Sequence, residues 1–528
     1  MIRVRQIKVP VLEDSQKMLL HKLSLKLKIS PKDVLFFEII KKSIDARDKS
    51  HIVYVYELNV LIKEEEKVLK KCSSLDIFFT HEEEYSFPKS NHMMEDRPII
   101  VGSGPAGLFC AYLLAEAGYK PIVFERGDSM EDRVSCVEKF FETNVLDPES
   151  NIQFGEGGAG TFSDGKLNTL TKDKMGRMKK VFEIFVENGA PEEILYIHNP
   201  HIGTDILRDV VVNMRNKIIS LGGEFHYRSC VTNLMLSGNR VIGVEVNSHD
   251  IYRSHHIVLA IGHSARDTFM MLHENGVSMN PKNFAVGVRV EHPRSMIDNS
   301  QYGKFAKELG SASYKLTYQT KSGRGVYSFC MCPGGFVVNA SSEKGRVAVN
   351  GMSNYERNEK NANSAIVVTV SSRDYGDELF AGMEFQRRLE EKAYELGKGY
   401  IPVQLYQDYR DNKESTQFIH VIPNTKGKVH FANLNSLFST DINNSLKEAI
   451  EDFGRKINGF NRGDALLLGV ESRTSSPVMI ERNEEGVSNI LNLYPCGEGA
   501  GYAGGITTAA MDGIKIAEFI VKKYRPFL

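Results

Sequence analysis

The chain has 528 residues, a formal net charge of −1 and 41% hydrophobic residues, the composition of a globular protein with roughly two to four domains. The balanced charge excludes a whole-chain electrostatic attraction to nucleic acid or to an anionic membrane. Its seven cysteines form no CxxC pair, which argues against a metal site and a disulfide scaffold and favours the cytoplasm. No uncharged apolar run approaches the ~18 residues of a membrane span.

Residues 1–90 are expected to form a small α+β domain that ends in a polar linker. Strand patterns at 2–9, 34–46 and 52–62 surround a helical pattern at 13–27, which predicts a βαββ module. The module holds 12 Lys/Arg against seven Asp/Glu up to its last strand. This surplus fits a solvated face better than an RNA-binding face.

The next segment carries a complete dinucleotide-binding unit. An apolar strand ending at Val101 leads into a glycine-rich turn, which is followed by a helix and by a strand ending at Glu125. Gly102 permits the tight turn, Gly104 lets a pyrophosphate approach the backbone, and Gly107 allows close packing of helix on strand. The helix N-terminus binds the anion and Glu125 accepts hydrogen bonds from a ribose.

The GxGxxG pattern of this unit occurs twice more, at 155–160 and at 499–504. Neither copy is followed by an amphipathic helix, a second strand and an acidic residue. We therefore expect one dinucleotide-binding unit. The copy near the C-terminus favours FAD over NAD, because the longer ribityl–flavin half of FAD needs a second contact. Glu498 can bond ribityl hydroxyls, and a helix starting near Gly505 can direct its positive end at the pyrophosphate or the flavin.

Eight motifs lie between residues 100 and 513: VGSGPAGLF, NIQFGEGGAGTFSDGKL, HIGTDILR, AIGHSARDT, VYSFCMCPGGFVVNASSE, NGMSNYERNEKNANSAIVV, ESRTSSPVMIER and GEGAGYAGGITTAAMDG. They resemble the motifs of FAD-dependent dehydrogenases of bacteria and plastids, relatives of the glutathione-reductase-fold flavoproteins. The resemblance implies an α/β fold. In that fold a Rossmann-type, glutathione-reductase-like FAD-binding domain, 97–280 and 441–528, is interrupted by a β-rich α+β substrate domain, 281–440.

Cofactor contacts are expected from the three glycine-rich segments, from the acidic residue after the second strand, and from two later strands. The resemblance places the strand near Val231 beside adenine and the small residues near Gly262 close to the cofactor. The expected contacts are Gly102, Gly104, Pro105, Ala106, Gly107, Glu125, Arg126, Gly158, Gly160, Thr161, Val231, Gly262, Gly497, Glu498, Gly504, Gly505 and Ile506.

Three residues are candidates for catalysis: Arg473 for an anion or flavin contact, His263 for proton transfer, and Cys332 of a CxC pair. On a regular strand Cys330 and Cys332 would point to one face and be poorly placed for a disulfide, so core packing is the favoured interpretation of the pair. A polar loop with Tyr355, Arg357, Asn361 and Asn363 is equally suited to bind a polar substrate or to be solvated.

The sequence thus predicts an FAD-dependent oxidoreductase, a dehydrogenase or reductase, that moves a hydride through flavin N5 to or from a small organic substrate. No second dinucleotide unit is present, so NAD(P)H as electron donor would dock transiently. A flavoprotein acting on RNA through the N-terminal module and a non-catalytic flavin redox sensor are the alternatives. The substrate, the electron partner and the oligomeric state stay open.

Overall fold

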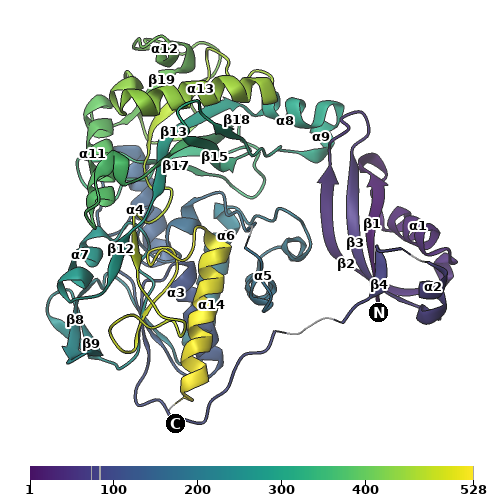
Figure 1. Cartoon of the computed structure of the whole chain (residues 1–528), viewed down its shortest axis with the longest axis horizontal. Helices are drawn as coiled ribbons and strands as arrows, with labels where there is room; N and C mark the ends of the chain where they lie inside the picture. Colours follow the sequence, from purple (N-terminus) through teal and green to yellow (C-terminus); the bar gives the residue numbers. More distant parts are fainter. Residues whose placement is uncertain (73, 82–84, 170, 527–528) are drawn as a thin grey trace.

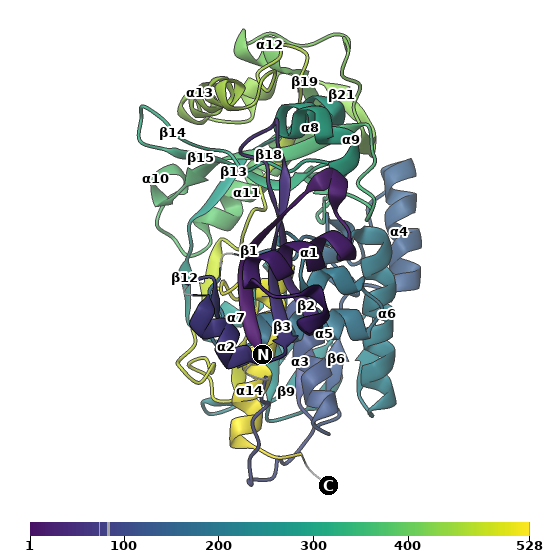
Figure 2. The same ribbon diagram turned by 90° about the vertical axis from the view of Figure 1, so that its right-hand side faces the viewer.

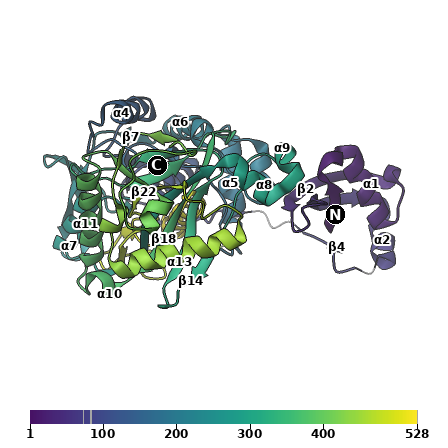
Figure 3. The ribbon, with the colours of Figure 1, turned by 90° about the horizontal axis from the view of Figure 1, so that it is seen from above.

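The computed structural model describes residues 1–72, 74–81, 85–169 and 171–526. A small N-terminal domain lies at one end of the molecule, beside a larger body built from a Rossmann-type domain and a second, β-rich domain (Figures 1 and 3). No helix of the described residues is long and apolar enough to cross a membrane.

The N-terminal domain is a four-stranded antiparallel sheet in the order β2-β3-β1-β4, counted over the described residues. The predicted βαββ order is present, and a short helix and a three-residue strand that the patterns did not predict follow it. Leu19, Leu23 and Leu27 are buried on one face of the first helix, against the sheet. The elements are β1 (Ile2–Pro10), α1 (Gln16–Leu27), β2 (Val34–Asp45), β3 (Val53–Ile62), α2 (Glu65–Lys71) and β4 (Ile77–Phe79).

The β2–β3 hairpin joins the N-terminal domain to the rest of the protein. Lys42 N donates to Tyr196 O at 2.8 Å, and His198 N donates to Lys42 O at 2.9 Å. At the hairpin tip, Ile52 belongs to a small apolar cluster with Phe305 of the second domain. Figure 2 shows the hairpin rising toward α8 (Arg294–Tyr302) and α9 (Ala306–Leu309). The hairpin therefore contacts the main body of the protein as well as forming part of its own sheet.

Five described strands form the parallel Rossmann sheet in the order β24-β11-β5-β6-β7. Parallel strands end at the same edge, so the C-terminal glycine segment after β24 meets the first glycine turn after β5. The strands are β5 (Ile99–Val101), β6 (Ile122–Phe124), β7 (Glu224–His226), β11 (Ile257–Leu259) and β24 (Leu493–Pro495), and the helices include α3 (Pro105–Glu116), α5 (Arg177–Glu187), α6 (Thr204–Ser220) and α14 (Ile506–Lys523). Helix α14 packs on α3, where a side chain at Gly513 would overlap the Ala106 carbonyl.

The segment 224–237 does not form one continuous strand. The backbone turns at Arg228, whose φ of 51° is in the left-handed region, and splits the segment between two sheets. The first part is β7, and the second is β8 (Val231–Ser237). Strand β8 pairs with β9 (Arg240–Val246), which also pairs with β10 (Asp250–Arg253).

Seven described strands form the sheet of the second domain, in the order β14-β15-β18-β13-β22-β19-β21. The predicted boundary at residue 440 is too early, because α13 (Thr440–Lys456) and β22 (Leu466–Glu471) complete the core of this domain. The other strands are β13 (Phe284–Pro293), β14 (Thr317–Gln319), β15 (Gly325–Cys332), β18 (Asn361–Val370), β19 (Ile401–Leu405) and β21 (Val429–Phe431).

Smaller elements connect the two large sheets or cover them. The helices are α4 (Met130–Thr143), α7 (Arg266–Glu274), α10 (Ser372–Tyr375), α11 (Ala381–Leu396) and α12 (Tyr406–Arg410), and the strands are β12 (Met279–Pro281), β16 (Phe336–Asn339), β17 (Val349–Met352), β20 (Thr425–Lys426) and β23 (Val478–Ile480).

The second glycine loop is held in place by Arg133 of α4, which is fully buried. Its guanidinium donates to the carbonyl oxygens of residues 151, 152, 155, 156 and 158 at 2.6–3.2 Å. Burial lowers its pKa to about 10, so it remains charged at neutral pH. The aromatic ring of Phe162 lies 4.7 Å from the guanidinium carbon. A cation bonded to carbonyl dipoles thus replaces the regular secondary structure that this loop lacks.

We predict that Arg133→Met lowers the free energy of unfolding by at least about 3 kcal/mol, because several buried carbonyl groups lose their donors. The variant should also lose flavin during desalting. Arg208→Met is the matched control, since Arg208 lies over the same Phe162 ring, at 4.6 Å. Urea denaturation and flavin absorbance measure both effects. Equal stability and equal flavin content in the two variants would contradict the role assigned to Arg133.

Candidate functional site

A cavity of about 1360 Å³ lies between the Rossmann-type domain, the β-rich domain and the β2–β3 hairpin. It is larger than the roughly 300–1,000 Å³ of pockets for drug-sized ligands. The three glycine-rich segments line it, together with strand ends of both large sheets. From the hairpin, Ile40 and Lys41 contribute to its wall. A long ligand and a smaller second molecule can share this space.

Two helix N-termini converge on the cavity. Helix α3 begins after Gly104 and α14 after Gly505, and among the described residues neither helix has a side-chain cap. The unpaired N–H groups and the positive ends of both helix dipoles favour an anion here. A Cβ atom added at Gly262, Gly504 or Gly505 would meet no described atom within 4 Å. The backbone at these glycines is therefore open to the cavity, and the resulting cradle fits the pyrophosphate and ribityl chain of FAD.

Most of the predicted cofactor residues line this cavity. They are Gly102, Gly104, Pro105, Ala106, Glu125, Arg126, Gly158, Gly160, Val231, Gly262, Glu498, Gly504, Gly505 and Ile506.

Three of the predicted cofactor residues do not line the cavity. Gly107 has the packing role that its spacing indicated, because a side chain there would overlap the Gly102 carbonyl. Thr161 is fully buried, and its carbonyl accepts a hydrogen bond from the Thr204 hydroxyl. Gly497 donates its N–H to Asp512 Oδ2 at 2.8 Å. These three residues therefore support the segments that line the cavity, through packing and hydrogen bonds.

Glu125 connects three loops through its carboxylate. Oε2 accepts from Ser103 N at 3.0 Å and Ser103 Oγ at 2.7 Å, while Oε1 accepts from Gly127 N and Gly155 N at 2.9 Å. The neighbouring Arg126 is paired with Glu149 and Asp267 on the rim. The predicted ribose acceptor therefore also organises the backbone around the site.

Arg473 and His263 both line the cavity, but the charge of Arg473 is already paired. Arg473 Nε and Nη2 each donate to a carboxylate oxygen of Glu390 at 2.8 Å, and Arg266 donates to the same carboxylate. Burial, then the charges of Arg473 and Arg266, lower the pKa of His263 to about 3. His263 is therefore neutral at physiological pH and can donate or accept one hydrogen bond, but it cannot act as an imidazolium acid.

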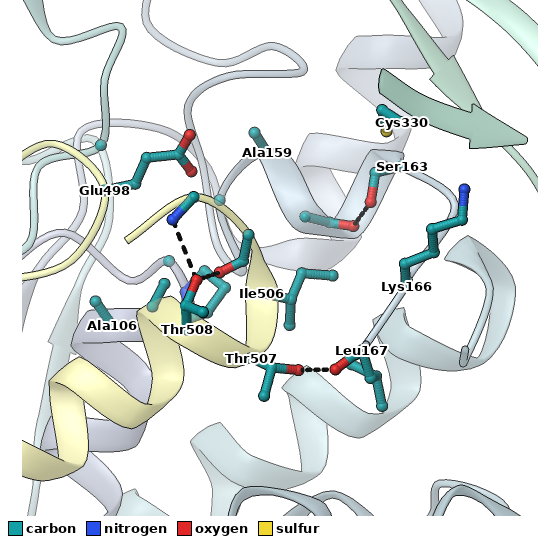
Figure 4. Close-up of a pocket in the computed structure, with 18 of the residues that line it drawn as sticks. Ala106, Ala159, Ser163, Lys166, Leu167, Cys330, Glu498, Ile506, Thr507 and Thr508 are labelled. Atoms are coloured by element: carbon teal, nitrogen blue, oxygen red, sulfur yellow. Dashed lines mark hydrogen bonds between the residues drawn. The ribbon is translucent and has the colours of Figure 1, made fainter. Parts of the chain in front are cut away.

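Glu498 and Lys166 lie on opposite sides of the cavity, with Ala159 and Ile506 between them (Figure 4). Burial raises the pKa of the Glu498 carboxyl to about 7, and the charge of Lys282 partly offsets this effect. Lys166 Nζ lies 3.6 Å from Asp164 Oδ2. At neutral pH the Glu498 carboxyl is thus partly protonated and partly ionised. The protonated form can donate a hydrogen bond, and the ionised form can only accept.

The cysteine pair differs from the prediction. Cys332 is fully buried and does not line the cavity, whereas Cys330 does. The strand is not regular there, because Cys330 has a φ of 43° and the pairing of β15 with β18 shifts between Phe329 and Cys332. The structure therefore places Cys330, and not the predicted Cys332, on the cavity wall.

The predicted polar loop is partly a strand, since Asn361 and Asn363 belong to β18 and are buried. Of the four loop residues, Arg357 lines the cavity, where it pairs with Asp164. Sequence analysis missed Arg133 and Lys41. Arg133 is one arginine in an ordinary amphipathic helix, and Lys41 reaches the cavity only because another domain docks beside it, so neither carries a local signal.

Family models match three parts of the chain. Residues 283–474 match "FAD-dependent protein, C-terminal domain-like", residues 100–130 match an NAD(P)-binding Rossmann-like domain, and residues 1–61 match a domain of unknown function, DUF8436.

Two curated relatives and two solved structures illustrate what the chain is similar to. A thiamine thiazole synthase of Saccharolobus islandicus is 45% identical over 69 residues, 13% of this chain and 23% of that protein. Glycine oxidase of Bacillus cereus, at 11% identity and a TM-score of 0.36, covers 82% of this chain and 99% of its own. L-proline dehydrogenase of P. horikoshii, at 13% identity and a TM-score of 0.33, covers 81% of this chain and 94% of its own. These structural scores are too low to transfer a function.

A protein of Clostridium beijerinckii, described as uncharacterized, is 46% identical over 531 residues, which is 99% of either chain. This near full-length identity shows that the chain belongs to one family with the C. beijerinckii protein, and the family models of its two larger domains identify this chain as an FAD-dependent oxidoreductase.

Proposed function

We propose that the protein is an FAD-dependent dehydrogenase or reductase, of the glutathione-reductase-like class, that moves a hydride between flavin N5 and a small organic substrate. The observation that carries the proposal is one continuous cavity. It joins two uncapped helix N-termini, suited to a dinucleotide, to a polar chamber under the β-rich domain.

The chain's own residues suit each part of the cofactor. The N-termini of α3 and α14 would hold the pyrophosphate, Glu125 would accept from the adenosine ribose, and Glu498 would bond the ribityl hydroxyls. FAD, when bound, supplies reversible two-electron transfer. The β-rich domain and the hairpin cover the opposite side of the cavity and would exclude water from the reacting atoms.

The chamber favours a substrate with a negatively charged group. Arg357 and Lys166 both pair with the buried carboxylate of Asp164. Two positive charges thus meet one negative charge, which leaves a net positive charge at this group. Lys41, from the N-terminal domain, adds a third cation to the lining. His263, neutral at physiological pH, supplies a hydrogen bond without adding charge. The electron donor that we favour is NAD(P)H bound transiently at this side.

Anaerobic stopped-flow spectroscopy tests the function directly. The flavin absorbance is followed on mixing with NADH, NADPH and a panel of carboxylate metabolites, and at least one compound should reduce it. A negative result with both nucleotides would overturn the NAD(P)H version of the proposal. Flavin that no compound reduces, and that no acceptor reoxidises faster than buffer alone, would favour a redox sensor instead.

Gly504 offers a test of the anion cradle. Gly504→Asp should raise the Kd of FAD by about tenfold or more, because a carboxylate at the start of α14 repels the pyrophosphate. Gly504→Ala is the control, since a methyl group there enters open space and should leave affinity nearly unchanged. Titration of flavin-free protein with FAD, followed by flavin fluorescence, gives both values. Equal weakening by the two variants would place the pyrophosphate elsewhere.

Glu498 predicts a pH dependence of stability. Its pKa is raised from 4.5 to about 7, so between these values the unfolded chain releases a proton that the folded protein retains. Stability is therefore lost as the pH rises through this window. Glu498→Gln removes this loss, so its Tm advantage over the wild type should be larger at pH 8 than at pH 5 in flavin-free protein. The exposed Glu484→Gln should show no such difference, and a constant advantage for Glu498→Gln would contradict the assignment.

A further inference from the structure

The end of β15 brings two thiols together at the edge of the cavity. Its pairing with β18 is regular from Val326 to Phe329 and then shifts before Cys332. Cys330 occupies the break with a φ of 43°, a conformation that few residues other than glycine adopt. As a result Cys330 lines the cavity, near Ser163 and Lys166 (Figure 4). Cys332 is fully buried and does not line the cavity.

A buried cation lies behind the two thiols. Arg289 is fully buried, pairs with Glu471 at 3.0 and 3.1 Å, and donates to the Cys330 carbonyl at 3.1 Å. Gly351 leaves the room for this arrangement, because a side chain there would overlap Arg289 and come within 2.6 Å of Cys332 Sγ. The side-chain nitrogen of Asn363, opposite Cys332 in β18, is buried without a described hydrogen-bond partner.

The two thiols are unequal. Cys332 Sγ donates to the Cys330 backbone carbonyl at 3.7 Å, which holds the two cysteines side by side. The neighbouring Cys332 thiol lowers the pKa of Cys330, and the neighbouring Cys330 thiol raises that of Cys332. The charges of Arg289 and Lys166 lower the Cys330 pKa further, against the effect of burial. Cys230 lines the same cavity, but burial raises its pKa to about 11. One cavity therefore holds a thiolate-forming cysteine with a second thiol behind it, and an ordinary protonated cysteine.

We propose that Cys330 and Cys332 form a redox-active dithiol that reduces a low-molecular-weight disulfide entering the cavity. The Cys330 thiolate attacks one sulfur of the disulfide, a new S–S bond forms, and the first thiolate leaves. Cys332 then gives up its proton, its sulfur attacks Cys330, and the second thiolate leaves with the formation of a Cys330–Cys332 disulfide. The substrate disulfide gains two electrons and ends as two thiols, and the protein dithiol loses two.

This arrangement is the one that thiol–disulfide exchange requires: an accessible thiolate as attacking group and a second thiol within reach to resolve the mixed disulfide. Core packing alone requires neither the left-handed backbone at Cys330 nor its place on the cavity wall. The exchange is balanced without the flavin, so its test is independent of the test of the proposed function.

The experiment uses the full-length, flavin-loaded protein with reduced cysteines and glutathione disulfide as the probe. Peptide mapping by mass spectrometry should find a Cys330–Cys332 link in the wild type and in the control Cys230→Ser. Cys332→Ser should instead accumulate a glutathione adduct at Cys330, and Cys330→Ser should give neither product. A wild type without the link, or Cys332→Ser without the adduct while its flavin is retained, would overturn the proposal.

A second measurement compares two cysteines within the wild type. In the wild type at pH 6.5, iodoacetamide should modify Cys330 at least about tenfold faster than Cys230, because the alkylation rate follows the thiolate fraction. Cys332→Ala should abolish much of this difference by removing the neighbouring thiol that lowers the pKa of Cys330. Equal rates at Cys330 and Cys230 in the wild type would show that Cys330 is an ordinary thiol and would overturn the proposal.

Discussion

The buried guanidinium of Arg133 is the interaction on which the cavity depends. It gathers carbonyl groups from a stretch of eight residues that forms no helix or strand and would otherwise need water to satisfy them. The loop held in this way lies directly on the first glycine turn, where Gly157 N donates to Ser103 O at 2.9 Å. Glu125 bonds to both loops from the other side. One cation and one anion thus hold the glycine-rich walls together.

A second constraint comes from the direction of the strands. All five described strands of the Rossmann sheet are parallel, so the segments that follow them lie at one edge. This edge brings residues near 104 and residues near 505 together, although 400 positions separate them in sequence. The two helix N-termini at this edge favour the same ligand, because both offer unpaired N–H groups to an anion.

Some polar side chains of the cavity are paired with other side chains of the protein, whereas others face the cavity and can interact with a ligand. Arg473 and Arg266 both pair with Glu390, and burial together with the two guanidinium charges keeps His263 neutral. Glu498 and Cys330, in contrast, face the cavity with a raised pKa and a lowered pKa respectively, and perturbed pKa values are common in groups used for proton and electron transfer.

The sequence by itself determined the dinucleotide-binding unit, because the turn, the helix start and the acidic residue lie within one local segment whose spacing has a physical cause at each position. It also indicated FAD, from a glycine-rich segment with too little chain behind it for a second unit. Only the tertiary structure decided that β22 belongs to the second domain, that Cys330 rather than Cys332 faces the cavity, and that Lys41 lines it. These features depend on pairing between distant strands, on one left-handed residue and on the docking of a separate domain, none of which leaves a pattern in neighbouring residues.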